Sequence, residues 1–324
     1  MKTDWRKSGA ILGLILGPVG ILYCLPFLVS GQPYLLHVIA LSCLYAIPAI
    51  GLNVMLGYTG LVSLGHMAFA GIGAYTAAVL MVDAKLGFWS ALAAATLAAG
   101  AAGFAVGAIC LRFRSHYFMI VTLAFGLLLH SVMNNWDAVT RGAAGFPGIP
   151  RPAPLALGEW AYPFGPLPNF YRLALTGLLV AFAFQWLIVN SKFGRVLAAI
   201  RQDEKLAAFK GANTMLYKTT AFAIGSAIAG FGGVLFVSFL RAASPDAFSL
   251  AESINMVLIV IIGGAGYLAG PILGALLYIG VPEYLRAANE LRLVLFGALL
   301  VLITLFAPHG LAGLLERGWR RLRR

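Results

Sequence analysis

The chain has 324 residues, of which 61% are hydrophobic and 10% charged, and its mean hydropathy is +0.90. Because soluble domains are about half apolar and a quarter charged, this composition excludes a soluble domain and indicates an integral membrane protein. The net charge of +12 does not by itself indicate nucleic-acid binding. Basic residues flank membrane spans on the cytoplasmic side, and the apolar runs leave no folded domain to hold a nucleic-acid site.

The apolar runs are long enough for a bundle of transmembrane helices. A helix rises about 1.5 Å per residue and needs about 20 apolar residues to cross about 30 Å of hydrocarbon. About ten runs qualify, at 9–29, 34–56, 61–82, 87–110, 117–136, 170–190, 218–240, 254–266, 270–284 and 291–308. The eighth and ninth are short, which favours two arms of one broken or re-entrant element. The sequence therefore predicts an all-α, polytopic bundle in membrane lipid, forming a single transmembrane domain over residues 1–324.

The distribution of basic residues predicts the orientation of this bundle. With ten crossings and a cytoplasmic N-terminus, sixteen of the 23 Lys and Arg residues lie on the cytoplasmic side, against seven in the opposite orientation. Both termini are therefore predicted to be cytoplasmic. The start of the chain, MKTDWRK before an apolar run, has no convincing cleavage site, so an uncleaved first span is expected.

Two loops are prominent in this topology. Residues 137–169 hold seven of the 15 prolines, which excludes a regular helix, and they are predicted to form either an ordered external cover or a spacer. Residues 191–218 lie on the cytoplasmic side, where alanines and leucine alternate with charges to predict an amphipathic helix that ends at Gly211. This helix either docks against a partner or lies on anionic lipid.

Motifs for nucleotide, metal and catalytic chemistry are missing from the sequence. There is no GxxxxGK[ST] phosphate loop, HExxH, GxSxG or strand-linked GxGxxG, so no catalytic residue or nucleotide cofactor is predicted in this chain. The five histidines are scattered without ligand spacing, so no metal site is predicted. Acidic residues mostly bound the spans, with Glu252 and Glu283 nearest to entering them, and no chain of buried carboxylates is expected.

Small residues four apart predict close helix packing in three places. These runs are Ala70, Ala74 and Ala78; Gly225, Ala229 and Gly233; and Gly266, Gly270 and Gly274. Packing explains less well two glycine-rich breaks, one in each half of the chain. Backbone that is exposed by such breaks at membrane depth must be buried in protein or line a watery cavity, which points to a solute pathway.

The residues proposed to line this pathway are Asn53, Gly57, Gly60, Ser63 and His66 in the first break, and Gly263, Gly264, Gly266 and Gly270 in the second. An ionisable side chain within a span, such as His66, is a functional hypothesis by default. The alternative for His66 is a neutral ring that donates to a backbone carbonyl of a neighbouring helix, and Asn53 has the same ambiguity.

Several segments resemble the branched-chain amino-acid ABC transporter permease family, and its LivM-type subunit in particular. They are GLNVMLGYTGLVSLGHMAFAGIGAYTAA (51–78), HYFMIVTLAFG (116–126), GFPGIP (145–150), IRQDEKLAAFKGANTMLYKTTAF (200–222), IIGGAGYLAGPILGALL (261–277) and LFGALLVLITLFAPHGLAGLL (295–315). They occur in the order of the family, so the resemblance covers nearly all of the chain after the first span.

The resemblance implies a permease subunit of an ATP-driven importer in the bacterial inner membrane. Its partners would be a second, LivH-like permease, two LivG/LivF-like ATP-binding subunits that use the ATP, and a periplasmic solute-binding protein. The residues implied to couple to the ATPases are Arg201, Asp203, Glu204, Ala207, Ala208 and Gly211. Relatives carry branched-chain amino acids, urea or short amides, or aromatic acids, so the solute stays open.

Two other classes are possible from the residues alone. A secondary transporter or channel acting alone would need an intramembrane ion or proton site, which the sequence does not indicate. A membrane-embedded enzyme would need a denser pattern of His and Asp than the chain contains.

Overall fold

The computed structural model describes residue 20 and residues 22–27, 32–111, 115–157, 160–285, 291–307 and 310–322. Six helices among these residues are long and apolar enough to cross a membrane. They run over Pro33–Thr59, His66–Asp83, Phe88–Cys110, Tyr117–Asn135, Leu167–Asn190 and Thr214–Leu240. An all-α, polytopic membrane protein is therefore confirmed, whereas the count of ten spans and the cytoplasmic termini stay predictions. The predicted first span, 9–29, lies outside the described residues except for residue 20 and the helical residues 22–27.

The elements follow one another with short connections. The first half contains α2 (Pro33–Thr59), α3 (His66–Ala78) with its π-helical extension η1 (Val79–Asp83), α4 (Phe88–Cys110), α5 (Ser115–Asn135), α6 (Asp137–Thr140), the 3₁₀ turn η2 (Gly142–Ala144), and strands β1 (Phe146–Pro147), β2 (Leu155–Leu157) and β3 (Trp160–Tyr162). The second half contains α7 (Leu167–Asn190), α8 (Lys192–Gln202), α9 (Glu204–Phe209), α10 (Thr214–Leu240), β4 (Ala242–Ala243), η3 (Pro245–Phe248), α11 (Leu250–Gly263), α12 (Gly270–Tyr284), α13 (Leu291–Phe306) and α14 (Gly310–Leu322).

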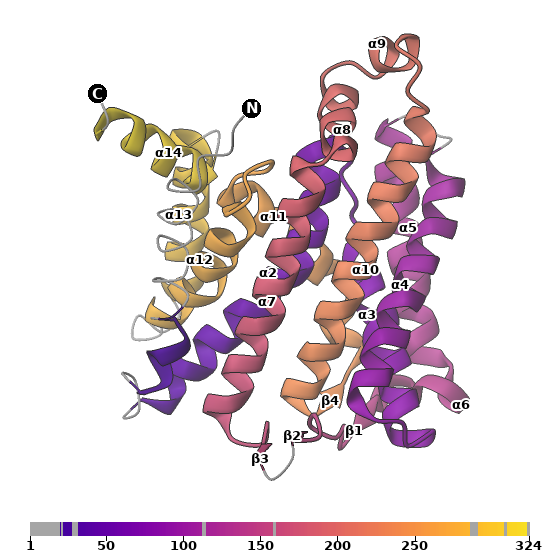
Figure 1. Cartoon of the computed structure of the whole chain (residues 1–324), viewed down its shortest axis with the longest axis vertical. Coiled ribbons are helices and arrows are strands. Elements are labelled where there is room, and N and C mark those ends of the chain that lie inside the picture. The colour runs from indigo at the N-terminus through magenta and orange to yellow at the C-terminus, as the bar shows by residue number, and fades with distance from the viewer. Residues whose placement is uncertain are drawn as a thin grey trace.

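Helix α10 is the centre of the bundle, and it runs between α7 on one side and α4 on the other (Figure 1). Its glycines allow this. A Cβ added at Gly225 would overlap the backbone of Gly51 in α2, and one added at Gly233 would overlap the backbone of Ala70 in α3. The packing role predicted for these small residues is therefore confirmed, because only a bare Cα lets the helices approach so closely.

The bundle has two different ends (Figure 1). Helices α8 and α9 lie at one end, called here the α9 end, and the short strands lie at the other, called the hairpin end. At the hairpin end β2 and β3 form an antiparallel hairpin, and β1 pairs with β4 so that Phe146 faces Ala243. Arg141 also pairs with Asp83 at 2.8 Å. These contacts tie the proline-rich segment to β4, which follows α10, and to η1 at the end of α3, which favours an ordered cover over a spacer.

Three predicted boundaries need comment. The two short runs, 254–266 and 270–284, form one broken element as predicted, in which residues 264–269 separate α11 from α12. The run 61–82 is wrong at its start, because the helix begins at His66 and residues 60–65 are not helical. The single helix predicted within 191–218 is also wrong. The chain forms α8 and α9, separated at Asp203, whose backbone is extended at φ −154° and ψ 106° and whose side chain caps α9.

Candidate functional site

The first break lies deep inside the bundle. Helix α2 runs toward the α9 end, and residues 60–65 then return alongside it before α3 begins. His66 Nε2 lies 3.0 Å from the carbonyl oxygen of Pro48, eleven residues before the end of α2. Eleven helical residues rise about 16 Å, a distance that six extended residues can span. The N-terminus of α3 therefore lies near half the depth of α2, and residues 60–65 form a re-entrant segment.

A second helix also begins near this depth. The connection after β4 returns from the hairpin end, and Ser249 starts α11 as its N-cap. The backbone N–H of Met67, at the start of α3, donates to Ser253 Oγ in the first turn of α11, 3.2 Å away. The N-termini of two interrupted helices thus meet in the interior, an arrangement typical of transporter binding regions.

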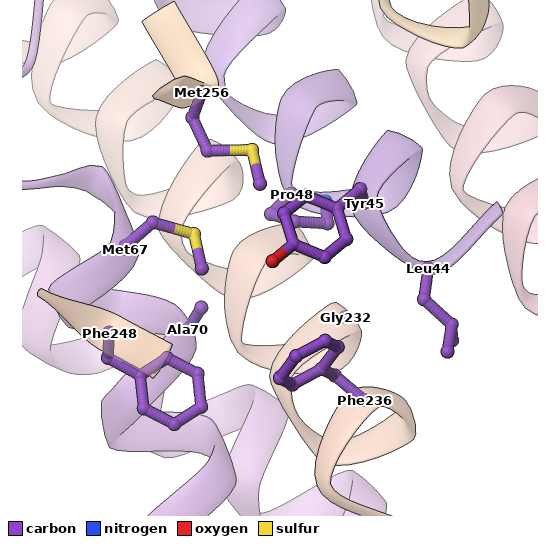
Figure 2. Close-up of a pocket in the computed structure, with 10 residues that line it drawn as sticks. Leu44, Tyr45, Pro48, Met67, Ala70, Gly232, Phe236, Phe248 and Met256 are labelled. Carbon is purple, nitrogen blue, oxygen red and sulfur yellow. The ribbon is translucent and has the colours of Figure 1, made fainter. Parts of the chain in front are cut away.

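The space around this meeting point is closed. Figure 2 shows Met67, Met256, Phe236 and Phe248 around it, with the hydroxyl of Tyr45 pointing between the two methionines. The cavity that they line has a volume of about 10 Å³. Because that is about the least space that holds one water molecule, no solute fits in this cavity in this conformation.

The second break is held against α2 by Asn53. The Asn53 side chain is fully buried, and its Nδ2 donates to the Tyr267 carbonyl at 3.0 Å while the backbone N–H of Gly266 donates to its Oδ1 at 2.9 Å. One amide therefore satisfies a donor and an acceptor of the loop that separates α11 from α12. Gly266 is needed there because its φ is +90°, a conformation that favours glycine.

Arg201 connects both breaks to the α9 end. This residue is in the last turn of α8, and its guanidinium donates to the Gly57 carbonyl in the last turn of α2. A Cβ added at Gly266 would lie 2.8 Å from Arg201 Nη1, so the same guanidinium also borders the second break. A movement of α8 would thus act directly on α2 and on the loop between α11 and α12.

Helix α9 combines internal anchoring with an apolar surface. Asp203 caps it by accepting from the Leu206 N–H at 3.0 Å, and Glu204 pairs with Lys218 of α10 at 2.5 Å. Ala207 is buried, whereas Phe209 is 89% exposed at the edge of the molecule. An aromatic side chain so exposed on a short protruding helix is the kind of residue that a partner protein covers.

The structure brings together some of the predicted pathway residues and separates others. Asn53, Gly57 and Gly266 meet at Arg201, and a Cβ on Gly60 would lie 3.6 Å from Arg201 Cγ. Gly263, Gly264 and Gly270 pack closely against one another where α11 meets α12. Ser63 and His66 are buried deeper in the bundle, away from this junction.

The predicted coupling residues share one segment but differ in exposure. Asp203, Glu204, Ala208 and Gly211 are exposed, and Gly211 has a φ of +88° after the end of α9.

The contact of His66 with Pro48 is the one expected of its packing alternative. Ser63 Oγ is buried and makes no hydrogen bond with the residues that the structure describes.

Glu252 lies deeper in the bundle than its sequence position predicts. Its carboxylate lies near the phenol of Tyr45, the thirteenth of the 27 residues of α2, so it is at half depth and does not bound a span. The missed signal was Ser249-Leu-Ala-Glu252, the Ser-x-x-Glu pattern of a helix N-terminus. That pattern marks where α11 begins but not how deep in the membrane it begins. In the described ranges, no three His, Cys, Asp or Glu side chains gather as metal ligands.

Comparison with known proteins gives a consistent result. The family described as branched-chain amino acid transport system, permease component, matches residues 34–304. The LivM permease of Escherichia coli K12, named for high-affinity branched-chain amino acid transport, is 36% identical over 88% of this chain and 71% of its own length. The LivH permease of the same organism is 27% identical over 85% of this chain and 93% of its own. A probable LivM from Methanocaldococcus jannaschii is 29% identical over 67% of each chain. No solved structure matches the chain with significance.

Proposed function

Because the chain belongs to the branched-chain amino acid transport permease family, and is of LivM type, we propose that it forms the membrane pathway of an ATP-driven importer together with a second permease. It is a permease component for the transport of branched-chain amino acids. LivM and LivH of Escherichia coli K12 are both named as permeases for high-affinity branched-chain amino acid transport, and this chain is similar to both. That similarity supports a pair of related permeases. A secondary transporter or channel acting alone is not favoured.

The observation that supports this mechanism most strongly is the contact of Arg201 with both breaks. ATP-binding subunits at the α9 end would cover α9 and the exposed Phe209. When they close, they would displace α8, and Arg201 would transmit that displacement to Gly57 and to the loop at Gly266. The helices on either side of the breaks would then move, so that the closed centre opens alternately to the two sides of the membrane.

The remaining partners are assigned by position. The hairpin end, with its paired strands β1 and β4, would face the periplasm and receive solute from a binding protein. The α9 end would face the cytoplasm of a bacterial cell, where both termini are also proposed to lie. This chain would use no cofactor and catalyse no reaction, since ATP would be bound and hydrolysed by the partner subunits.

A cross-linking experiment tests the docking of α9. Phe209→Cys, modified with a photoactivatable group in the assembled transporter, should form an adduct with an ATP-binding subunit. Tyr284→Cys is a matched control, because Tyr284 is 90% exposed but lies at the end of α12 toward the hairpin end. An adduct from Tyr284 and none from Phe209 would contradict both the docking surface and the orientation.

A further inference from the structure

A carboxylate lies at half depth of the bundle, and no cationic side chain in the described ranges pairs with it. Glu252 belongs to the first turn of α11, and Tyr45 and Tyr278 are close enough for their phenols to interact with it. None of the ion pairs in the described part of the chain includes Glu252. An acidic side chain at this depth is costly unless it has a charged partner or faces a polar cavity, so it is a functional feature by default.

The hydrogen bonds of Glu252 are incomplete. Asn255 Nδ2 donates to Oε1 over a long 3.4 Å. Oε2 is buried and has no hydrogen bond of ordinary geometry among the residues that the structure describes. The Tyr45 phenol is the other donor within reach of this carboxylate. An ionised carboxylate accepts several hydrogen bonds, so acceptor capacity is left for a further donor.

A hollow lies on the same side of α2, nearer to the hairpin end. It has a volume of about 600 Å³ and lies between the first turns of α2 and the last turns of α12, with Gln32, Ser42, Gly280 and Glu283 among its lining. Ser42 and Tyr45 are three residues apart, so the Ser42 end of the hollow and the phenol beside Glu252 lie on one face of α2, about one helical turn apart. Its volume is in the range of sites that hold small organic ligands.

We propose that Glu252, with Tyr45 and Asn255 beside it, binds the ammonium group of the transported amino acid halfway along the pathway. This rests on the proposed function, and it adds the chemical group that this chain recognises. An α-ammonium group has three N–H donors and one positive charge, which match the free acceptor capacity and the missing cation. The solute would enter by the hollow, where the second permease would shield the open side from lipid.

The alternative occupant of Oε2 is a proton, and substitution distinguishes the two. Glutamine resembles a protonated glutamate in shape and charge, so Glu252→Gln would preserve a neutral structural role but remove the site for a cation. The matched control is Asp246→Asn, which also removes one carboxylate six residues earlier, where the side chain is 93% exposed.

The assay uses proteoliposomes with the complete transporter, its binding protein and ATP, and it measures radiolabelled leucine uptake. We expect Glu252→Gln to lower uptake about tenfold or more, as for loss of a charge-assisted contact, while Asp246→Asn stays near wild type. Unchanged uptake by Glu252→Gln would overturn the inference. If wild-type vesicles take up no leucine, the proposed function fails, which is a different result.

A measurement on the wild-type complex decides the matter if the variant does not assemble. A hydrophobic carbodiimide should modify Glu252, as located by mass spectrometry, and leucine with the binding protein should slow this modification at least severalfold. Modification at the same rate with and without leucine, or no modification at all, would contradict a solute-accessible site.

Discussion

Asn53 gives the sharpest test of how the two breaks are held together. Replacing it by leucine keeps the number and branching of the side-chain heavy atoms but removes both hydrogen bonds to the loop, at 3.0 Å and 2.9 Å. The Tyr267 carbonyl and the Gly266 N–H then lose their partner, and each unsatisfied buried group costs about 1–3 kcal/mol. Because residues 265–268 are only half-buried, water replaces part of this loss, and we expect a destabilisation of about 2–3 kcal/mol.

Thermal unfolding of the purified transporter measures this effect. Unfolding entropy of about 2.1 cal/mol/K per residue gives about 0.7 kcal/mol/K for 324 residues, so a loss of 2–3 kcal/mol corresponds to a fall in melting temperature of about 3–4 °C. The control is Asn135→Leu, since Asn135 is exposed and its side chain bonds only to Ser131 within α5. If Asn53→Leu melts within about 1 °C of the wild type, Asn53 does not hold the second break against α2.

Three further predictions concern packing and charge. Gly233→Ala should destabilise the folded chain by about 1–3 kcal/mol, because the added methyl group overlaps the backbone of Ala70. Gly280→Ala is the control and should be neutral, because its methyl group meets no atom within 4 Å. Equal melting temperatures of the two variants would contradict this packing. A double-mutant cycle of Glu204→Gln and Lys218→Met should give a coupling free energy of at most about 1 kcal/mol, which falls as salt is added, because the Glu204 side chain is 49% exposed. A larger coupling that does not depend on salt would show that the pair is buried. His66→Ala should lower the melting temperature but keep leucine uptake per assembled complex within about twofold, as expected for a packing contact with Pro48; loss of uptake by a stable complex would instead favour its role in the pathway.

The spans and their breaks could be predicted because they depend on local composition. Twenty apolar residues make a span in any context, and a cluster such as Gly263 to Gly270 interrupts a helix wherever it occurs. The stretch Gly60 to Gly65 was harder. It is apolar enough for a span, but it is not helical, and a Cβ on Gly65 would overlap the backbone of Thr122 in α5. Its burial by other helices, which no local pattern records, makes the non-helical backbone stable.

The contacts of the site depend on residues far apart in sequence. Arg201 and Gly57 are 144 residues apart, and Asn53 and Tyr267 are 214 apart. Glu252 shows the same limit, since its capping pattern predicts a helix start and only the fold shows that this start lies at half depth. The positions of the two breaks could therefore be predicted from the sequence better than the contacts within them.

In the proposed function this chain transports branched-chain amino acids only as part of an ATP-driven assembly. Leucine uptake can be measured in proteoliposomes that contain either this chain alone or this chain with the second permease, the ATP-binding subunits and the binding protein. We expect uptake only by the complete assembly and only with hydrolysable ATP. Uptake by this chain alone, at a rate unaffected by ATP, would contradict it.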